Sequence, residues 1–400
     1  MALIAKRLQA VKPSPTLAVA AKAKELAAKG INIISLAAGE PDFDTPDNIK
    51  QAAIEGIKNG QTKYTAVSGT PELRKAVCAK FKRENNIEYS IDEVIVGTGG
   101  KQVIYNLFMA TIDEGDEVII PAPYWVSYPD MVLLAGGKPV FVTADMDRGF
   151  RVSASDIEKE ITNKTKWLII NSPSNPTGAA YNREELKQIT DLLKKYPQLH
   201  IMSDDIYEHI IFDDFKFYTL AEIAPDLKER IFIINGVSKS YSMTGWRIGY
   251  GAGSKEIIKA MDVIQSQSTS NPSSISQVAA LEALSGEQGF IKVNTKNFQK
   301  KRDLVLKLVN DIKGLDCYKS EGAFYLFPKC IDLFGKKTPA GGTINNGSDL
   351  ATYLLEYANV AVVPGIAFGL EGYFRISYAT SEEILTEACD RMNKAISQLK

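Results

Sequence analysis

Two basic side chains eight residues apart could do chemistry together in the segment Ser238–Tyr250, where Lys239 follows an expected strand and Arg247 comes later. A lysine amine forms an imine with an aldehyde cofactor. An arginine guanidinium is a permanent, forked cation that suits a phosphate group. In an arbitrary loop such a lysine is only a solvated charge, so this interpretation depends on the rest of the chain.

A second candidate anion site is the turn Gly97-Thr98-Gly99-Gly100-Lys101, which follows an expected strand and opens an expected helix. Backbone N–H groups at the start of a helix favour a phosphate. The turn fits neither the GxxxxGK[ST] pattern nor the GxGxxG pattern of nucleotide-binding loops. Together with Arg247 and Ser238, it is the phosphate cradle that the sequence predicts.

Composition argues against several other chemistries. The 400 residues contain 47 Lys and Arg against 48 Asp and Glu, a net charge of −1, which gives no support for a nucleic-acid or membrane-surface role. The two histidines accompany no nucleophile motif, and the four scattered cysteines lack metal-site spacing. The N-terminus has no signal-peptide pattern, and no apolar run is long enough for a membrane span. We expect a cytoplasmic enzyme without a metal site.

Short apolar runs alternate with amphipathic stretches through the middle of the chain, and these runs are apolar throughout. This pattern predicts a mainly parallel α/β sheet covered on both faces. The expected strands are Val94–Val96, Glu117–Pro121, Pro139–Val142, Trp167–Asn171, His200–Ser203, Ile231–Asn235 and Ile248–Ala252. The expected helices between them include Gln102–Ile112, Tyr124–Leu134 and Arg183–Lys195.

The two ends of the chain have different patterns. In the N-terminal part we expect a helix over Thr16–Lys29, a strand over Ile31–Leu36, a helix that starts at Thr45-Pro46 and a helix over Leu73–Arg83 capped at Thr70. Beyond Ser285 we expect the helices Phe298–Ile312 and Glu382–Leu399, the strands Ala323–Phe327, Val360–Val363 and Tyr373–Ser377, and an exposed loop over Gly335–Ser348. These elements form a smaller α+β domain.

The segment around Lys239 resembles the lysine signature of the class I/II aminotransferases, which are fold-type I pyridoxal-phosphate enzymes. It is most similar to the Iβ subgroup of bacterial aspartate aminotransferases. Other family motifs occur in the same order: Gly39-Glu40-Pro41-Asp42-Phe43, Tyr64, Gly99-Gly100-Lys101, Pro123-Tyr124-Trp125, Asn175-Pro176-Thr177-Gly178, Ser203-Asp204-Asp205-Ile206-Tyr207-Glu208 and Arg375. The resemblance implies a large cofactor domain with a seven-stranded sheet (48–288), a small domain (289–400) and an N-terminal segment (1–47) that packs with the small domain.

The resemblance also implies roles for individual residues toward pyridoxal 5′-phosphate. Lys239 carries the cofactor and acts as base and acid, and Asp204 pairs with the pyridine nitrogen, which must stay protonated; Asp205 is the alternative. Tyr207 and Asn175 hydrogen-bond the phenolic oxygen of the cofactor. The remaining cofactor-binding residues would be Gly99, Gly100, Lys101, Trp125 and Ile206 beside the ring and phosphate, and Ser238, Arg247 and Tyr64 at the phosphate.

Substrate binding is implied in the same way. Arg375 takes the α-carboxylate beside the Gly39 backbone, near Trp125 and Asn175, and Lys101 takes a distal carboxylate. An unpaired cation disfavours neutral side chains, so we expect aspartate with 2-oxoglutarate as acceptor, in ping-pong order. Lys12 matches a lysine tied to prephenate transamination in relatives, although a solvated charge is the simpler interpretation.

Three points stay open at this stage. Gly236 stands where many relatives have a serine that contacts the phosphate, so Ser238 or water would have to replace that contact. Tyr64 matches a tyrosine that reaches the phosphate from the neighbouring subunit, which implies a homodimer with shared active sites. An aminotransferase with an aromatic or neutral preference, or a lyase of the same fold, is the alternative function; a regulator with this fold would need a DNA-binding region that the chain lacks.

Overall fold

A computed structural model describes residues 3–11, 13 and 15–400 of the chain. Its central feature is a seven-stranded sheet in the order β2-β8-β7-β6-β5-β3-β4. Within it β8 runs antiparallel to β2 and β7, and the other neighbouring pairs are parallel. The strands are β2 (Val94–Gly97), β3 (Glu117–Ala122), β4 (Lys138–Thr143), β5 (Thr165–Asn171), β6 (His200–Asp204), β7 (Ile231–Gly236) and β8 (Gly249–Ala252). The mainly parallel α/β sheet predicted from the sequence is therefore confirmed.

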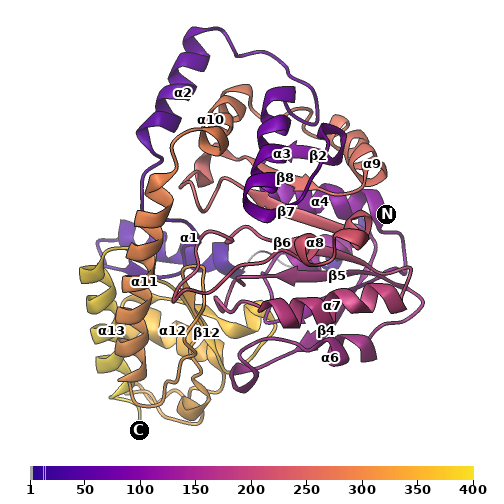
Figure 1. The fold of residues 1–400 in the computed structure, drawn as a ribbon. Coiled ribbons are helices and arrows are strands. Elements are labelled where there is room, and N and C mark those ends of the chain that lie inside the picture. Colours follow the sequence, from indigo (N-terminus) through magenta and orange to yellow (C-terminus); the bar gives the residue numbers. More distant parts are fainter. Residues whose placement is uncertain (1–2, 12, 14) are drawn as a thin grey trace.

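Helices cover both faces of this sheet (Figure 1). One face carries α3 (Pro71–Asn85), α6 (Ala154–Lys159), α7 (Arg183–Lys195), α8 (Leu220–Ile223) and α10 (Ser274–Ser285), and α2 (Asp47–Lys58) packs against α10. The other carries α4 (Gly100–Thr111), α5 (Tyr128–Leu134) and α9 (Lys255–Ser266). Along β5, Leu168 and Ile170 face the first group and Trp167 and Ile169 face the second. Because successive side chains of a strand point to opposite faces, a strand buried on both sides must be apolar throughout.

The C-terminal part has its own core, drawn in orange to yellow in Figure 1. Its elements are α11 (Gly289–Asn310), β9 (Tyr325–Leu326), α12 (Gly347–Tyr357), β10 (Val360–Ala361), β11 (Val363–Pro364), β12 (Phe374–Ser377) and α13 (Glu382–Ile396). β11, β12 and β9 form an antiparallel sheet. Near the N-terminus, α1 (Pro15–Ala28) leads to β1 (Ile34–Ser35), which pairs in parallel with β10. The domain boundaries at 47/48 and 288/289 stay predictions.

Short 3-10 helices connect several of these elements. They are η1 (Lys6–Gln9), η2 (Ile91–Glu93), η3 (Met146–Arg148), η4 (Pro225–Arg230), η5 (Thr244–Trp246), η6 (Ile331–Leu333) and η7 (Gly365–Phe368). No helix in the described part of the chain combines the length and apolar character needed to cross a bilayer.

Several expected boundaries are wrong, and hydrogen bonds explain three of them. The helix expected from Tyr124 begins only at Tyr128: the N–H of Tyr124 donates to the distant Phe368 carbonyl, and the N–H of Tyr128 closes a turn on the Trp125 carbonyl. β1 covers only two residues of the strand expected over Ile31–Leu36, because the N–H groups of Ile31 and Ile33 are used in local turns. The Thr45 hydroxyl does not cap α2 but donates to the Ser242 carbonyl.

The C-terminal expectations differ in the same modest way. α11 extends nine residues further toward the N-terminus than the predicted start at Phe298, and only Tyr325–Leu326 of the strand expected over Ala323–Phe327 is paired. The loop expected over Gly335–Ser348 is mainly exposed, yet Ile344 is buried and its last two residues begin α12. By contrast, the Thr70 cap of α3 is confirmed, since its side chain accepts from the N–H of Leu73.

Candidate active site

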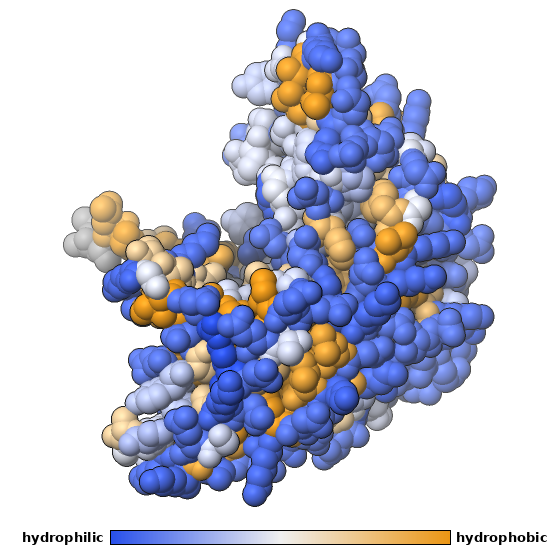
Figure 2. Space-filling view, turned by 90° about the vertical axis from the view of Figure 1, so that its left-hand side faces the viewer, coloured by the Kyte–Doolittle hydropathy of each residue, from blue (hydrophilic) through white to orange (hydrophobic). Residues whose placement is uncertain are grey.

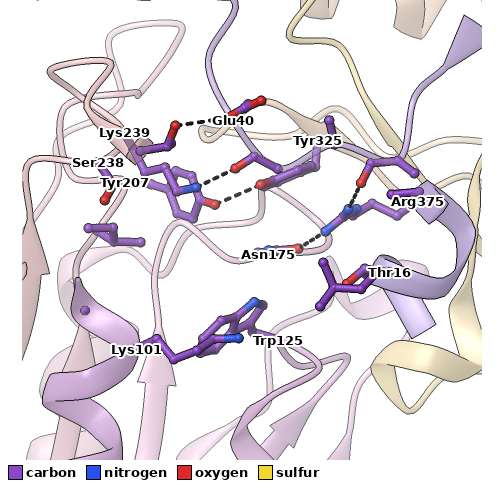
Figure 3. A pocket seen from close by; sticks show the side chains of 18 of the residues that line it. Thr16, Glu40, Lys101, Trp125, Asn175, Tyr207, Ser238, Lys239, Tyr325 and Arg375 are labelled. Carbon is purple, nitrogen blue, oxygen red and sulfur yellow. Dashed lines mark hydrogen bonds between the residues drawn. The ribbon is translucent and has the colours of Figure 1, made fainter. Parts of the chain in front are cut away.

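A cavity of about 760 Å³ lies where the carboxyl ends of β5, β6 and β7 meet the start of α4, the usual place for a ligand in an open α/β sheet. The last residues of β5 and β6, Asn171 and Asp204, line it. The loop after β7 contributes Ser238 and Lys239. The small C-terminal core supplies Tyr325 and Arg375, so the cavity draws on both cores (Figure 3).

Lys239 points into this cavity, and its Nζ donates to the carbonyl oxygen of Gly39 at 2.5 Å. Burial and, to a lesser extent, the positive charges of Arg375 and Arg247 together lower the pKa of the Lys239 amine to about 8. An amine with this pKa is neutral, and therefore nucleophilic, in a useful fraction of molecules near neutral pH.

Asp204 is the acidic counterpart of that amine. Its carboxylate is 94% buried, accepts a hydrogen bond from the Tyr128 hydroxyl at 2.6 Å, and accepts a second from the N–H of Ile206 at 3.3 Å. Burial raises the pKa of Asp204 to about 6, although the bond from Tyr128 opposes this shift. The neighbouring Asp205 is also buried but does not line the cavity; it accepts from the Ser203 hydroxyl. The geometry thus favours Asp204 over Asp205 for any group bound here.

Arg375 is a buried cation without a carboxylate partner in the described part of the chain. Its guanidinium donates to Asn175 Oδ1 at 2.9 Å and to the Ala37 carbonyl at 2.7 Å, and its Nε has no hydrogen-bond partner. The ring centres of Tyr325 and Phe368 lie 4.6 and 5.0 Å from its Cζ atom. Since a buried charge is normally paired, Arg375 is prepared for an anion that enters the cavity.

Arg247 and Lys101 add positive charge at the other end of the cavity, near the start of α4. Within the described residues neither has a carboxylate at ion-pair distance; the Arg247 side chain donates to the Thr244 carbonyl, and Lys101 Nζ lies 4.9 Å from the centre of a Trp125 ring. Although Lys101 still reaches solvent, the surrounding protein and the charge of Arg247 lower the pKa of its amine.

Gly99 explains how Arg247 comes so close to the helix start. A Cβ atom at Gly99 would lie only 2.2 Å from Arg247 Nη2, and one at Gly249 would lie 2.1 Å from the backbone N of Gly100. Gly99 also has a backbone φ of +80°, a value that residues with a side chain rarely adopt. Glycine at these positions lets a guanidinium and free backbone N–H groups face the same point, as a phosphate requires.

Most residues expected in the site line this one cavity. The expected lining residues found there are Gly39, Gly100, Lys101, Trp125, Asn175, Asp204, Ile206, Tyr207, Ser238, Lys239, Arg247 and Arg375. The roles given to them remain hypotheses. The Tyr207 hydroxyl lies 2.9 Å from the Tyr325 hydroxyl, which holds the ring in place. Burial raises the pKa of Tyr207 well above the ordinary value.

Three expected residues are not among those that line the cavity. Gly99 lies beside it and is covered by Arg247. Tyr64 is 93% exposed on this chain and does not line the cavity. Lys12 lies outside the described residues.

Some lining residues were not predicted as part of the site. Asn171 Nδ2 donates to the Asp204 carbonyl at 2.9 Å and its Oδ1 accepts from the N–H of Asn175 at 2.9 Å, which fixes two expected residues relative to each other. Its position as the last residue of a buried strand is a signal that could have found it. The sequence context of Tyr128 and Tyr325 gives no comparable signal.

Comparisons with known proteins agree with this geometry. The model of the family "Aminotransferase class I and II" matches residues 31–392. The chain is 67% identical to a probable aspartate/prephenate aminotransferase of Rickettsia felis, over 100% of this chain and 98% of the relative, and 58% identical to an aspartate/prephenate aminotransferase of Cereibacter sphaeroides, over 98% of each. Among solved structures, the aspartate aminotransferase from Rhizobium meliloti superposes with a TM-score of 0.97 at 51% identity, with 100% of both chains covered.

Proposed function

The chain belongs to the class I and II aminotransferases, and from this premise we propose that it transfers the amino group of L-aspartate to 2-oxoglutarate with pyridoxal 5′-phosphate held on Lys239. The observation that carries the proposal is one cavity that contains a lysine amine, a buried carboxylate and three cations without carboxylate partners in the described chain. Such a set suits a ligand with several negative charges and a reactive carbonyl.

The residues present fit this cofactor. Gly99 leaves room for Arg247 beside the first N–H groups of α4, and Gly100 and Ser238 line the same cavity, so these residues would hold the phosphate. Asp204 would hold a protonated pyridine nitrogen, because its buried carboxylate lines the cavity and would gain a direct ion-pair partner there. When bound, pyridoxal phosphate supplies an aldehyde carbon and a ring that accepts electrons from the substrate Cα.

Lys239 then has two tasks. Its amine holds the cofactor at rest, and once released it takes the proton from the substrate Cα and returns a proton elsewhere in the same half-reaction. A lowered pKa suits both tasks, because the group must be a neutral base and then a competent acid near neutral pH. Tyr207 and Asn175 would hydrogen-bond the phenolic oxygen, and Trp125 and Ile206 would enclose the ring.

The substrate would be held at both ends. Arg375 would form a two-pronged pair with the α-carboxylate, near the Gly39 carbonyl and Trp125. Lys101 would take the distal carboxylate, a contact that alanine or phenylalanine cannot make. The same residues would then bind 2-oxoglutarate in the second half-reaction, because it has the same two carboxylates; ping-pong kinetics follow.

A homodimer is part of the proposal. Tyr64 is 93% exposed, and Ile54 and Ile57 on α2 are about half exposed, although such side chains are usually covered. Figure 2 has an apolar patch at its top, where α2 lies. A second chain would cover these residues and bring its own Tyr64 to the phosphate end of the cavity. A cytoplasmic location, for which the composition is suitable, belongs to the same proposal.

Prephenate is a second candidate substrate, since the relatives from Rickettsia felis and Cereibacter sphaeroides carry that name beside aspartate. Lys12 is the residue that would assist it. An aromatic or neutral preference remains the alternative to aspartate.

Steady-state assays with aspartate, prephenate, alanine and phenylalanine as alternative partners decide between these options. Aspartate with 2-oxoglutarate should give the highest kcat/KM and parallel double-reciprocal lines. A higher kcat/KM with alanine or phenylalanine would contradict the role of Lys101, and intersecting lines would contradict the ping-pong order. Arogenate formed from prephenate at a comparable rate would establish the second activity, and its absence would remove prephenate from the proposal.

A further inference from the structure

A buried charge cluster lies behind the loop that carries Lys239, and none of its members lines the cavity. Helix α3 contributes Lys80, which is 0% exposed, and Glu84; the turn after β6 contributes Glu208 and His209. The Lys80 ammonium pairs with Glu208, lies 3.5 Å from Glu84 and donates to Asn85 Oδ1 at 2.8 Å. Lysine is buried to this degree only when it is paired, so the cluster is a built feature of the fold.

The cluster contacts the chain on both sides of Lys239. Before it, the Asn235 side chain at the end of β7 donates to Glu208 Oε1 at 2.8 Å. After it, the Ser240 hydroxyl lies 3.0 Å from His209 Nδ1, and the other ring nitrogen of His209 lies 3.0 Å from Glu84 Oε2. The imidazole is therefore a bridge between α3 and the residue that directly follows Lys239.

A metal site is the obvious rival for this cluster, because Glu84, Glu208 and His209 offer ligand atoms within 4.8 Å of one another. The Lys80 ammonium already supplies the positive charge there and contacts both carboxylates. His209 also uses both ring nitrogens in contacts with Ser240 and Glu84. The cluster is thus filled, and positioning is the function that its contacts support.

The other charged and titratable groups around the imidazole are also accounted for. Glu84 is paired with Arg83 as well as Lys80, and the Glu208 carboxylate lies 3.8 Å from the His209 ring. The Tyr241 ring of the lysine loop packs edge-on against the imidazole. From α11, the Thr295 hydroxyl donates to the His209 carbonyl.

We propose that His209 is a positioning residue for Lys239, and that it acts by holding the Ser240 hydroxyl against α3. The proposal rests on the proposed function, in which Lys239 carries the cofactor and moves the α-proton. A base that is displaced by a fraction of an ångström loses much of its efficiency, because proton transfer needs a short, aligned contact. His209 would thus affect the reaction without touching substrate or cofactor.

Two substitutions at His209 separate its two contacts. His209→Asn keeps a polar atom near the position of Nδ1, toward Ser240, while His209→Gln keeps one near Nε2, toward Glu84. Ser240→Ala deletes only the hydroxyl, and it tests the same contact independently if a His209 variant does not fold. The other histidine offers a matched control: His200 lies at the opposite end of β6, where its ring contacts the Gln198 carbonyl, so His200→Asn makes the same change away from the loop.

The measurements use the purified protein with pyridoxal phosphate bound. They are the pH at which the visible band of the cofactor is half converted, the cofactor affinity from a titration of the stripped protein, and kcat and KM for aspartate. Loss of one hydrogen bond of ordinary strength should shift the band midpoint by about 0.5 to 1 pH unit and lower kcat by about five- to tenfold in His209→Gln and Ser240→Ala. KM should stay within about twofold, and His209→Asn should lie nearer to the wild type.

The outcomes separate the two claims. The positioning role alone would be overturned if the wild type shows the band but His209→Gln and Ser240→Ala have the same band midpoint and kcat as His200→Asn. The same would follow if the variants lowered the melting temperature but left the band unchanged, because the role would then be purely structural. A wild-type protein with no band would overturn the proposed function, and this inference with it. A shifted midpoint in His209→Gln, with the double variant His209→Gln/Ser240→Ala no worse than either single variant, would establish the bridge.

Discussion

The cavity and the charge cluster behind the loop that carries Lys239 are both rich in charged side chains, but their cations are paired differently. In the cluster, Lys80 is surrounded by carboxylates and an amide. In the cavity, Arg375 is equally buried yet has only neutral partners and one unbonded nitrogen. Paired burial stabilises a particular arrangement, whereas an unpaired buried cation is costly unless a ligand completes it. The difference separates structural charge from charge held for a substrate.

The largest expected effect tests the structural side of this comparison. Lys80→Met leaves Glu208 buried without its cation, so the free energy of unfolding should fall by about 3–5 kcal/mol. Urea unfolding of the cofactor-free protein, followed by fluorescence, measures it. A loss below about 1 kcal/mol would mean that the cluster is not a structural unit.

Arg375→Gln tests the cavity side. Without the guanidinium the α-carboxylate loses its partner, and kcat/KM for aspartate should fall by about 10²- to 10³-fold, while the cofactor-free protein should be as stable as the wild type or more so.

Arg302→Gln is the matched control, because Arg302 is a fully buried arginine that pairs with Asp213 and Asp303. It should lower stability and leave substrate affinity nearly unchanged. If both arginine variants lost stability to the same extent, the distinction between the two regions would fail.

Two carboxylates sharpen the comparison through pH. Burial would raise the pKa of Glu84, but the hydrogen bond to His209 and the charge of Lys80 outweigh it and lower the pKa to about 2, from an ordinary 4.5. That stabilisation is therefore present above pH 4.5 and is lost as the pH falls toward 2. Burial raises the pKa of Asp204 from 3.8 to about 6. Its contribution to the free energy of unfolding is therefore most favourable below pH 3.8, and it is lost as the pH rises through 6.

At pH 7, Glu84→Gln should therefore destabilise the cofactor-free protein, and Asp204→Asn should stabilise it, each by about 2–3 kcal/mol. Unfolding free energies of both variants at pH 4 and pH 7 check the signs. Changes of the same sign at pH 7 would contradict this assignment of the two carboxylates.

The smallest expected effect concerns Lys101, which still reaches solvent. Lys101→Gln should reduce the preference for aspartate over alanine by about 10- to 100-fold, mainly through a higher KM for aspartate. Alanine kinetics in the same variant are the internal control and should change little. An unchanged ratio of kcat/KM for aspartate to that for alanine would show that another residue binds the distal carboxylate.

The two regions also differ in how far the sequence could predict them. Lys239, Asp204 and Asn175 follow recognisable buried strands, and the carboxyl ends of parallel strands meet at one edge. Their convergence was therefore foreseeable, as was the sheet itself. The resemblance added Arg375, which no local pattern would have assigned to the same cavity, and the role of Lys101 toward a distal carboxylate.

The cluster could not be predicted in this way. Lys80 and Glu208 are separated by 128 residues, and each stands in an ordinary helix or turn pattern that permits full exposure. Burial of such a pair depends on how α3 packs on the sheet, which periodicity does not specify. The late start of α5 has a similar origin, because the N–H of Tyr124 bonds to Phe368 in a distant part of the chain.

The central claim is that Lys239 carries the cofactor in a cavity built for a dicarboxylic amino acid. Absorbance spectra in the near-ultraviolet and visible, recorded before and after addition of aspartate, test it most directly, with Lys239→Ala as the comparison. We predict a visible band in the wild type that aspartate removes and 2-oxoglutarate restores, and a Lys239→Ala protein that cannot complete this cycle. A wild-type protein that shows no band after addition of pyridoxal phosphate, or a Lys239→Ala protein that cycles normally, would contradict the account.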